Sequence, residues 1–224
     1  MIGVIIQARM GSSRLPGKIL KQIGNKKLLD HIFYRLKFLE YPVTTILATT
    51  MSVRDDIVAE YCALNGIHCF RGSENNVLER YYLCAKQYEF QHVIRLTADN
   101  PFIDVEEIVR LINLHLRSQA DYSHSFTALP VGVGSEIFSF AALKRCYLLG
   151  KEPHHVEHVN EYILDHPDEF KIALLNVDKS KNRPDIRLTI DTPEDYKKAC
   201  YIAEHGGSQL MTTEEAIRLC LQYV

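Results

Sequence analysis

The sequence lacks a long apolar run, a cysteine-pair motif and an excess of positive charge. No stretch approaches the roughly 20 consecutive apolar residues of a membrane-spanning helix, so we expect no membrane partner. Its 26 lysines and arginines face 28 acidic residues, which excludes a generally basic nucleic-acid-binding surface. The six cysteines contain no Cys-x-x-Cys pair. In a chain of this length they favour buried, reduced thiols in a cytoplasmic protein over a disulfide framework.

The first residues, MIGVIIQ, also lack the basic start and the longer apolar stretch of a secretory signal peptide. Internal repeats and low-complexity tracts are absent as well. With 46% hydrophobic residues, the chain has enough apolar side chains for a sizeable core. We therefore expect residues 1–224 to fold as a single domain.

Short apolar runs alternate with helical patterns through the first half of the chain. Ile2–Ile6 is almost wholly apolar, which is typical of a central strand buried on both faces. We predict further strands at 43–49, 67–70 and 92–96, and helices at 28–39, 55–64, 77–88 and 105–116. Such alternation indicates βαβ units. It predicts an α/β, Rossmann-like, three-layer α/β/α sandwich with a mostly parallel central sheet.

The second half is less regular, so its elements are predicted one by one. We predict strands at 136–138, 171–177 and 186–190 from their short apolar runs. We predict helices at 140–149, 155–164, 193–204 and 212–221, the third of which has a proline in its first turn.

The loop after the first strand has the composition of an anion cradle. Ligands bind at the carboxyl ends of strands in open α/β sheets, and this loop follows such an end. Its glycines free backbone N–H groups, its serines add hydroxyls and its basic residues add positive charge. These residues are Arg9, Gly11, Ser12, Ser13, Arg14, Gly17 and Lys18. The spacing matches neither the Walker A motif nor the Gly-x-Gly-x-x-Gly fingerprint. The pattern indicates a polyphosphate site; a flexible basic surface loop is the alternative.

The charge distribution agrees with a small anionic ligand. Residues 1–50 hold eight basic and two acidic residues, whereas the remainder has a net charge of −8. A local basic loop on an otherwise acidic protein favours a compact anion over a long polyanion. A solvated basic face would give the same count, and charge alone favours it.

Four motifs resemble those of a known family. The segment 6–18, IQARMGSSRLPGK, resembles the signature of the cytidylyltransferases that activate sugar acids, the CMP-N-acylneuraminate and CMP-3-deoxy-manno-octulosonate synthetases. It is closest to the spore coat polysaccharide biosynthesis SpsF-like branch. FRGSE at 70–74, RLTADNP at 95–101 and IDTPEDY at 190–196 follow in the same order. The resemblance covers nearly the whole chain and implies a GT-A-like nucleotidyltransferase fold.

The resemblance also implies an activity and its residues. It implies transfer of CMP from CTP to a sugar, such as a nonulosonic or related sugar acid, with release of pyrophosphate for cell-surface polysaccharide biosynthesis. Arg14 and Lys18 would be catalytic and hold the phosphates. The nucleotide would contact Ala8, Arg9, Gly11, Ser12, Ser13 and Arg71. Expected partners are CTP, a sugar acceptor and a second copy of the chain in a homodimer.

Two aspartates are the candidate ligands for Mg²⁺, the expected cofactor. Asp99 and Asp191 each follow a predicted strand, so both should reach the sheet edge that carries the first loop. Two carboxylates facing a triphosphate suit a hard cation that prefers oxygen. Asp99 has an alternative role in an Asx-turn before Asn100-Pro101, and Asp191 has one as a helix N-cap.

Glu136 and His158 are the candidate acceptor contacts. The branch often has Gly-Leu-Asp-Val-Glu where this chain has GVGSE at 132–136, so the usual acid is replaced by Gly134. This departure puts the sugar specificity in doubt. The histidines of HHVEH at 154–158 suggest zinc because His154 and His158 lie one helical turn apart. Since no third ligand is evident, we favour a helix start with interfacial or acceptor-contacting histidines.

Two arginines lie in predicted strands, and other functions stay open. We expect Arg95 and Arg187 to pair with nearby carboxylates such as Asp185. The same scaffold serves nucleotidyltransferases that use another nucleotide. It also suits a GT-A-like glycosyltransferase, although the Asp-x-Asp of that class is absent, and a non-catalytic nucleotide-binding protein.

Overall fold

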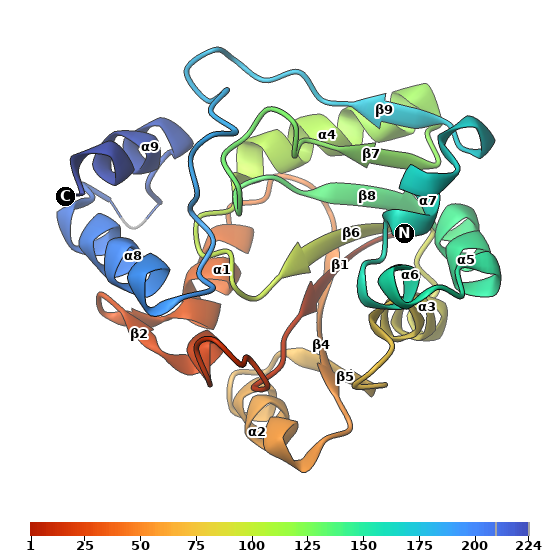
Figure 1. Cartoon of the computed structure of the whole chain (residues 1–224), viewed down its shortest axis with the longest axis horizontal. Coiled ribbons are helices and arrows are strands. Elements are labelled where there is room, and N and C mark those ends of the chain that lie inside the picture. The colour runs from red at the N-terminus through yellow and green to blue at the C-terminus, as the bar shows by residue number, and fades with distance from the viewer. Residues whose placement is uncertain (209, 224) are drawn as a thin grey trace.

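The computed structural model describes residues 1–208 and 210–223. Its centre is a seven-stranded sheet of order β5-β4-β1-β6-β8-β7-β9 (Figure 1). The strands are β1 (Ile2–Gln7), β4 (Thr44–Thr50), β5 (His68–Gly72), β6 (His92–Thr97), β7 (Tyr122–His124), β8 (Glu136–Ser139) and β9 (Ile172–Leu174). Only β8 runs antiparallel to its neighbours in this sheet. The predicted mostly parallel sheet is therefore confirmed.

Strand β1 is buried on both faces, as its apolar sequence predicts. It lies between β4 and β6 and pairs with each in parallel. Successive side chains of a strand point to opposite faces. Accordingly, Val4 and Ile6 pack into one core, whereas Ile5 packs into the other.

Helices cover the two faces of the sheet and complete the three layers (Figure 1). The hydrophobic core on one face of the sheet is formed by strand residues and by five helices: α1 (Leu28–Leu36), α2 (Asp56–Leu64), α4 (Val105–Ser118), α8 (Pro193–His205) and α9 (Thr213–Gln222). The opposite core is shared with α3 (Val77–Gln87), α5 (Phe140–Leu149) and α7 (Glu161–Asp165), and α6 (Pro153–Glu157) packs against α3. This arrangement is the predicted α/β/α sandwich.

The start of α8 fixes the backbone beside Asp191. The Thr192 hydroxyl accepts from the Asp195 amide, and the Asp195 carboxylate accepts from the Thr192 amide at 3.0 Å. Thr192, rather than Asp191, is therefore the N-cap of this helix. Asp191 lies one residue before the cap, which leaves its carboxylate free for other partners.

Two sequence predictions are wrong in detail. The predicted helix 155–164 is broken into α6 and α7, because the chain turns between residues 158 and 160. The predicted strand 186–190 is absent; this segment makes a single bridge, from Arg187 to Val131. A ladder cannot continue there because residues 130–133 form a turn, in which Gly132 has a φ of +93°. Strand β7 and the small hairpin of β2 (Gln22–Ile23) and β3 (Lys26–Lys27) were not predicted.

The expected burial of the cysteines is confirmed in part. All six cysteines are free thiols, but only Cys62, Cys84 and Cys146 are buried. Within residues 1–208 and 210–223, every helix is too short or too polar to cross a bilayer.

Candidate active site

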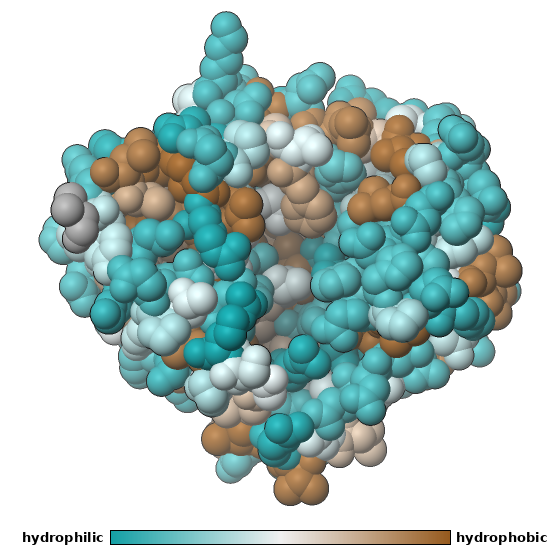
Figure 2. Space-filling view, viewed as in Figure 1, coloured by the Kyte–Doolittle hydropathy of each residue, from teal (hydrophilic) through white to brown (hydrophobic). Residues whose placement is uncertain are grey.

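The first loop and the two aspartates line one cleft at the carboxyl edge of the sheet. The cleft has a volume of about 210 Å³. Figure 2 shows a hollow at the centre of this face, over the ends of β1 and β6. Of the residues predicted to form the site, it is lined by Ala8, Arg9, Gly11, Ser12, Ser13, Arg14, Lys18, Asp99 and Asp191. The predicted convergence is thus present in the structure.

The first loop is held in shape by its own hydrogen bonds. The carbonyl of Met10 accepts from the amides of Ser12 and Gly17 at 2.9 and 3.3 Å. The Ser12 hydroxyl accepts from the amide of Leu15 at 3.3 Å. Gly17 has a φ of +67°, a conformation that glycine adopts without steric cost, and leads into the short 3-10 helix η1 (Lys18–Leu20). The loop is therefore a shaped turn and not an unstructured surface segment.

A buried aspartate that sequence reasoning missed anchors this loop. The Asp55 carboxylate accepts from the Met10 amide at 2.7 Å and from the Thr50 hydroxyl. Asp55 is only 2% exposed and belongs to the short helix η2 (Val53–Asp55). Its only signal in the sequence was an acid at the start of a predicted helix, which usually indicates a cap. In the structure it ties the segment after β4 to the loop after β1.

Lys18 joins the two candidate metal ligands. Its ammonium donates to Asp99 Oδ2 at 3.0 Å and to Asp191 Oδ1 at 2.9 Å. The amide of Ile190 donates to the carbonyl of Asp99 at 2.9 Å and holds the two chain segments side by side. Asp191 therefore reaches the site without the predicted strand 186–190.

Asp191 forms ion pairs with three basic residues, more than any other residue that lines the cleft. Arg14 lies 3.2 Å from its Oδ1 atom, and Arg187 contacts Oδ2. Burial would raise the pKa of this carboxyl, but the bonds from Lys18 and the charges of Lys18 and Arg14 outweigh it and lower the pKa. Asp191 thus stays ionised well below neutral pH. Arg187 pairs with Asp191 and Asp195 rather than with Asp185.

The donor set of the pair fits a hard divalent cation. Asp99 and Asp191 supply carboxylate oxygens, the ligands that Mg²⁺ prefers. Both face the same ammonium, so their oxygens already share one cation. The Thr97 hydroxyl donates to Asp99 Oδ1 and orients that carboxylate.

Three predicted site residues lie outside the lining of the cleft. Arg71 donates to the carbonyls of Thr50 and Ser52 and pairs with Asp56 at 2.7 Å. Its guanidinium therefore braces the segment after β4. Its contact with a nucleotide stays a prediction.

Glu136 and His158, the predicted acceptor contacts, differ in exposure. Glu136 is fully buried, and its two oxygens accept from Arg95 and Tyr122. Arg95 thus has the carboxylate partner expected for it, although that partner is not Asp185. His158 is exposed at the end of α6. Neither residue lines the cleft, so their contact with an acceptor stays a prediction.

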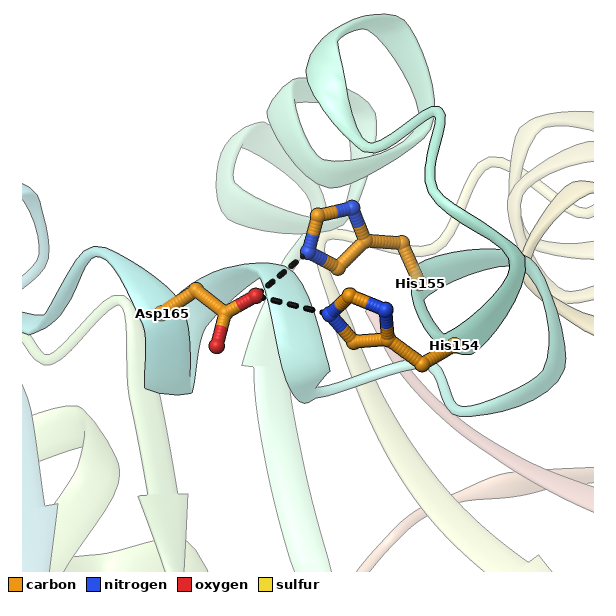
Figure 3. Close-up of side chains that lie close together, drawn as sticks. All are labelled: His154, His155 and Asp165. Carbon is orange, nitrogen blue, oxygen red and sulfur yellow. Dashed lines mark hydrogen bonds and ion pairs between the residues drawn. The ribbon is translucent and has the colours of Figure 1, made fainter.

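The histidine segment forms a hydrogen-bonded cluster (Figure 3). His154 Nε2 and His155 Nε2 each lie 2.8 Å from Asp165 Oδ2. The Glu152 amide donates to His155 Nδ1 at 3.4 Å. Asp165 is a third group beside the two histidines that the sequence did not show, and the ligand atoms of the three lie within 4.8 Å of one another. His154 pairs with Asp165 rather than with His158.

Comparison with known proteins finds a family model and several relatives that match this chain. The family model described as "Cytidylyltransferase" matches residues 3–219. The chain is 37% identical over 212 residues to the spore coat polysaccharide biosynthesis protein SpsF of Bacillus subtilis, covering 92% of this chain and 87% of SpsF. A 3-deoxy-manno-octulosonate cytidylyltransferase of Pseudoalteromonas atlantica is 31% identical over 126 residues, 53% of this chain and 47% of that protein.

A solved structure extends the likeness to the whole fold. A cytidylyltransferase from Leptospira borgpetersenii superposes with a TM-score of 0.92 at 31% identity, covering 99% of this chain and 94% of that one. The family match, the curated relatives and the solved structure agree with the resemblance of the four motifs. The chain belongs to the cytidylyltransferase family.

Proposed function

We propose that the protein transfers CMP from CTP to a hydroxyl of a sugar and releases pyrophosphate. The observation that carries this proposal is the convergence of Arg14, Lys18 and two carboxylates on one cleft. Cations of this kind offset the charge of a triphosphate, and paired carboxylates suit the divalent cation that accompanies it. The family and the names of the relatives support cytosine as the base and a sugar acid as the acceptor class.

In the proposed reaction, the acceptor oxygen forms a bond to the α-phosphorus. The bond from that phosphorus to the bridging oxygen of the β-phosphate breaks, pyrophosphate leaves and the hydroxyl proton passes to solvent. Arg14 and Lys18 offset the charge on the leaving pyrophosphate, and the loop amides orient the phosphates. The main-chain groups of Ala8 and Arg9 face the base.

Asp99 and Asp191 would hold Mg²⁺. When bound there, the ion would polarise the α-phosphate and neutralise part of its charge. The work of the chain itself is to hold the two carboxylates together through the Ile190–Asp99 backbone bond. His158 and Glu136 remain proposed acceptor contacts. A Cβ atom at position 134 would lie 3.0 Å from the Phe126 ring, so a larger residue at this position would need Phe126 to shift.

Release of pyrophosphate tests the proposal. CTP with Mg²⁺ is incubated with a panel of nonulosonic and amino sugars, and UTP, GTP and ATP serve as comparisons. We expect release with CTP and at least one acid sugar. Thermal shifts with the four nucleotides measure base preference separately. A shift without pyrophosphate release from any acceptor would favour a nucleotide-binding protein that is not an enzyme.

Asp99→Asn tests the proposed metal ligand. Because the substitution removes the negative charge but keeps the shape, kcat should fall at least about 100-fold. Stability should fall by about 1.5–3 kcal/mol, the range for one hydrogen bond to a charged group. Asp168→Asn, on the exposed short helix η3 (Pro167–Glu169), is the matched control. Unchanged turnover of Asp99→Asn would remove Asp99 from the site.

The homodimer and the cytoplasmic location also stay proposals. The apolar residues of the predicted helix 155–164 are the proposed dimer surface. Of these, Tyr162 and Ile163 are buried within the chain, whereas Leu164 is 46% exposed. Light scattering coupled to size exclusion will measure the oligomeric state.

A further inference from the structure

Lys18 places a cation of the protein itself between the two aspartates. Its ammonium donates to Asp99 Oδ2 at 3.0 Å, to Asp191 Oδ1 at 2.9 Å and to the carbonyl of Ile190 at 2.7 Å. These bonds use all three protons of the ammonium. The side chain is 10% exposed. In this arrangement Lys18 has no proton left for a phosphate group.

The other carboxylate oxygens of the pair are occupied as well. Asp99 Oδ1 accepts from the Thr97 hydroxyl, and Asp191 Oδ2 accepts from Arg187. Arg14 makes a further contact with Asp191 Oδ1 at 3.2 Å. Mg²⁺ needs direct oxygen contacts of about 2.0–2.1 Å and gives up its water reluctantly. A divalent ion must therefore compete with these donors, and their positive charges weaken its attraction to the site.

We propose that Lys18 is the resident cation of the Asp99–Asp191 pair in the nucleotide-free protein. A divalent ion replaces it there only when a triphosphate draws the ammonium away. This inference rests on the proposed function, because it takes the ligand of the cleft to be a nucleoside triphosphate. It adds a second role for Lys18, which is to keep the metal site closed until the nucleotide arrives.

The position of Lys18 in the cleft makes this exchange possible. Lys18 lines the cleft together with Arg14 and the serines of the first loop. A partly buried ammonium that loses its acceptors is costly unless new ones replace them. A triphosphate supplies such acceptors, whereas a metal ion alone does not. Metal and nucleotide then bind with positive coupling, and each raises the affinity of the other by the same factor.

Binding of Mn²⁺ without nucleotide tests the inference directly. Free Mn²⁺ is measured by electron paramagnetic resonance with the wild type, Lys18→Met and Lys21→Met. Lys21 is exposed and its ammonium lies over the Tyr196 ring, so it is the matched control. We expect Lys18→Met to bind Mn²⁺ at least about tenfold more tightly than the wild type, within the usual range of coupling. The Lys21 variant should match the wild type.

A double variant locates the gained ion. Adding Asp99→Asn to Lys18→Met should remove the gain in affinity, because one of the two carboxylates is lost. Lys18→Met binding no more tightly than the wild type would overturn the inference, as would tight binding by the nucleotide-free wild type. If Lys18→Met does not fold, Lys18→Gln serves the same test, with the Mn²⁺-induced rise in Tm as the measurement.

The role of the nucleotide is measured in the wild type. In equilibrium dialysis, equimolar CTP should increase the Mn²⁺ retained by the protein at least about fivefold; no increase would contradict the exchange. CTP binding without the gain in Lys18→Met would overturn the resident cation and keep the proposed function. The gain in Lys18→Met without any CTP binding would overturn the proposed function and keep the resident cation.

Discussion

Asp55 shows how one buried side chain shapes the candidate site from outside it. Its carboxylate accepts from the amide of Met10 and from the hydroxyl of Thr50, and it does not line the cleft. A buried acceptor of this kind fixes a loop because leaving a buried amide unpaired is costly. The first loop therefore depends on a residue more than 40 positions away in the chain.

Asp55→Ala should weaken nucleotide binding and stability together. Losing the acceptor leaves the amide of Met10 unpaired, so the free energy of unfolding should fall by about 1–3 kcal/mol. The KM for CTP should rise more than kcat falls, because Asp55 positions the loop from outside the cleft. Asp55→Asn, which keeps one acceptor oxygen, should recover part of both losses. Steady-state kinetics and urea unfolding measure these effects, and equal losses in the two variants would contradict the positioning role.

Among single residues, sequence reasoning found the polar side chains that stand in loops or just after predicted strands. Lys18, Asp99 and Asp191 stand beside loops and strand ends, where polar residues are informative. Asp55 was missed because an acid before a helix is usually a cap. Arg71 was placed near the nucleotide by resemblance alone, and the structure pairs it with the carbonyls of Thr50 and Ser52.

The elements were predicted best where the apolar pattern was clear. β1 and β4 lie close to the predicted ranges because they are short, nearly continuous buried runs, and α4 does so because its buried residues recur at helical spacing. The predicted strand 186–190 failed because its apolar residues are buried without a ladder partner. β7 is only three residues long, which is too short for a period to show.

A cluster of buried charges joins α4 to the C-terminal segment. Lys181 lies 2.9 Å from Asp104 and 3.2 Å from Glu107, and all three side chains are less than a tenth exposed. Asp104 also caps α4 and accepts from Thr213 in α9 at 2.6 Å. Lys181 therefore pairs with both buried carboxylates, of which Glu107 also pairs with Arg110, and Asp104 joins α4 to α9.

Lys181→Ala should destabilise the fold by about 3–5 kcal/mol, because it leaves the buried Asp104 carboxylate without its ion-pair partner. The exposed Lys179→Ala is the control and should change stability by less than about 0.5 kcal/mol.

Burial would raise the pKa of Asp104, but bonds from Thr213, the Glu107 amide and Lys181 lower it. Its contribution is therefore present above the ordinary pKa of aspartate and lost as the pH falls through the lowered value. Urea unfolding as a function of pH measures both effects; a loss in Lys181→Ala equal to that of Lys179→Ala would refute the cluster.

For the whole molecule, charge is distributed so that the basic N-terminal segment meets acidic residues of the later chain at one edge. The first 50 residues carry the cations of the cleft, and Asp99 and Asp191 come from the acidic remainder. The place of Asp99 could be predicted because parallel strands bring their carboxyl ends together, whereas Asp191 reaches the same edge from a segment that is not a strand. The identity of the acceptor could not be predicted, because Glu136 is buried and neither it nor His158 lines the cleft.

The stability of the molecule should fall on mild acidification because of a buried histidine. Burial lowers the pKa of His115 to about 4, and its ring is bonded to His92 and Ser123. Between about pH 6.5 and 4 the unfolded chain binds this proton and the folded chain does not, so stability falls as the pH falls. The shift corresponds to about 3 kcal/mol.

His115→Gln keeps a polar side chain without the titration and should flatten the pH dependence in this window. His205→Gln, at the exposed end of α8, should leave it unchanged. The measurement is urea unfolding between pH 4 and pH 7. A wild-type curve that does not change over this window would contradict a neutral buried His115.

The account as a whole claims that a nucleoside triphosphate lies between the first loop and the two aspartates. A crystal structure with CTP and Mn²⁺, phased or checked at the manganese anomalous signal, tests it most directly. We predict the triphosphate against residues 8–18, with manganese bound to Asp99 and Asp191 and the ammonium of Lys18 on a phosphate oxygen. Nucleotide bound elsewhere on the molecule, or manganese away from both carboxylates, would contradict the account.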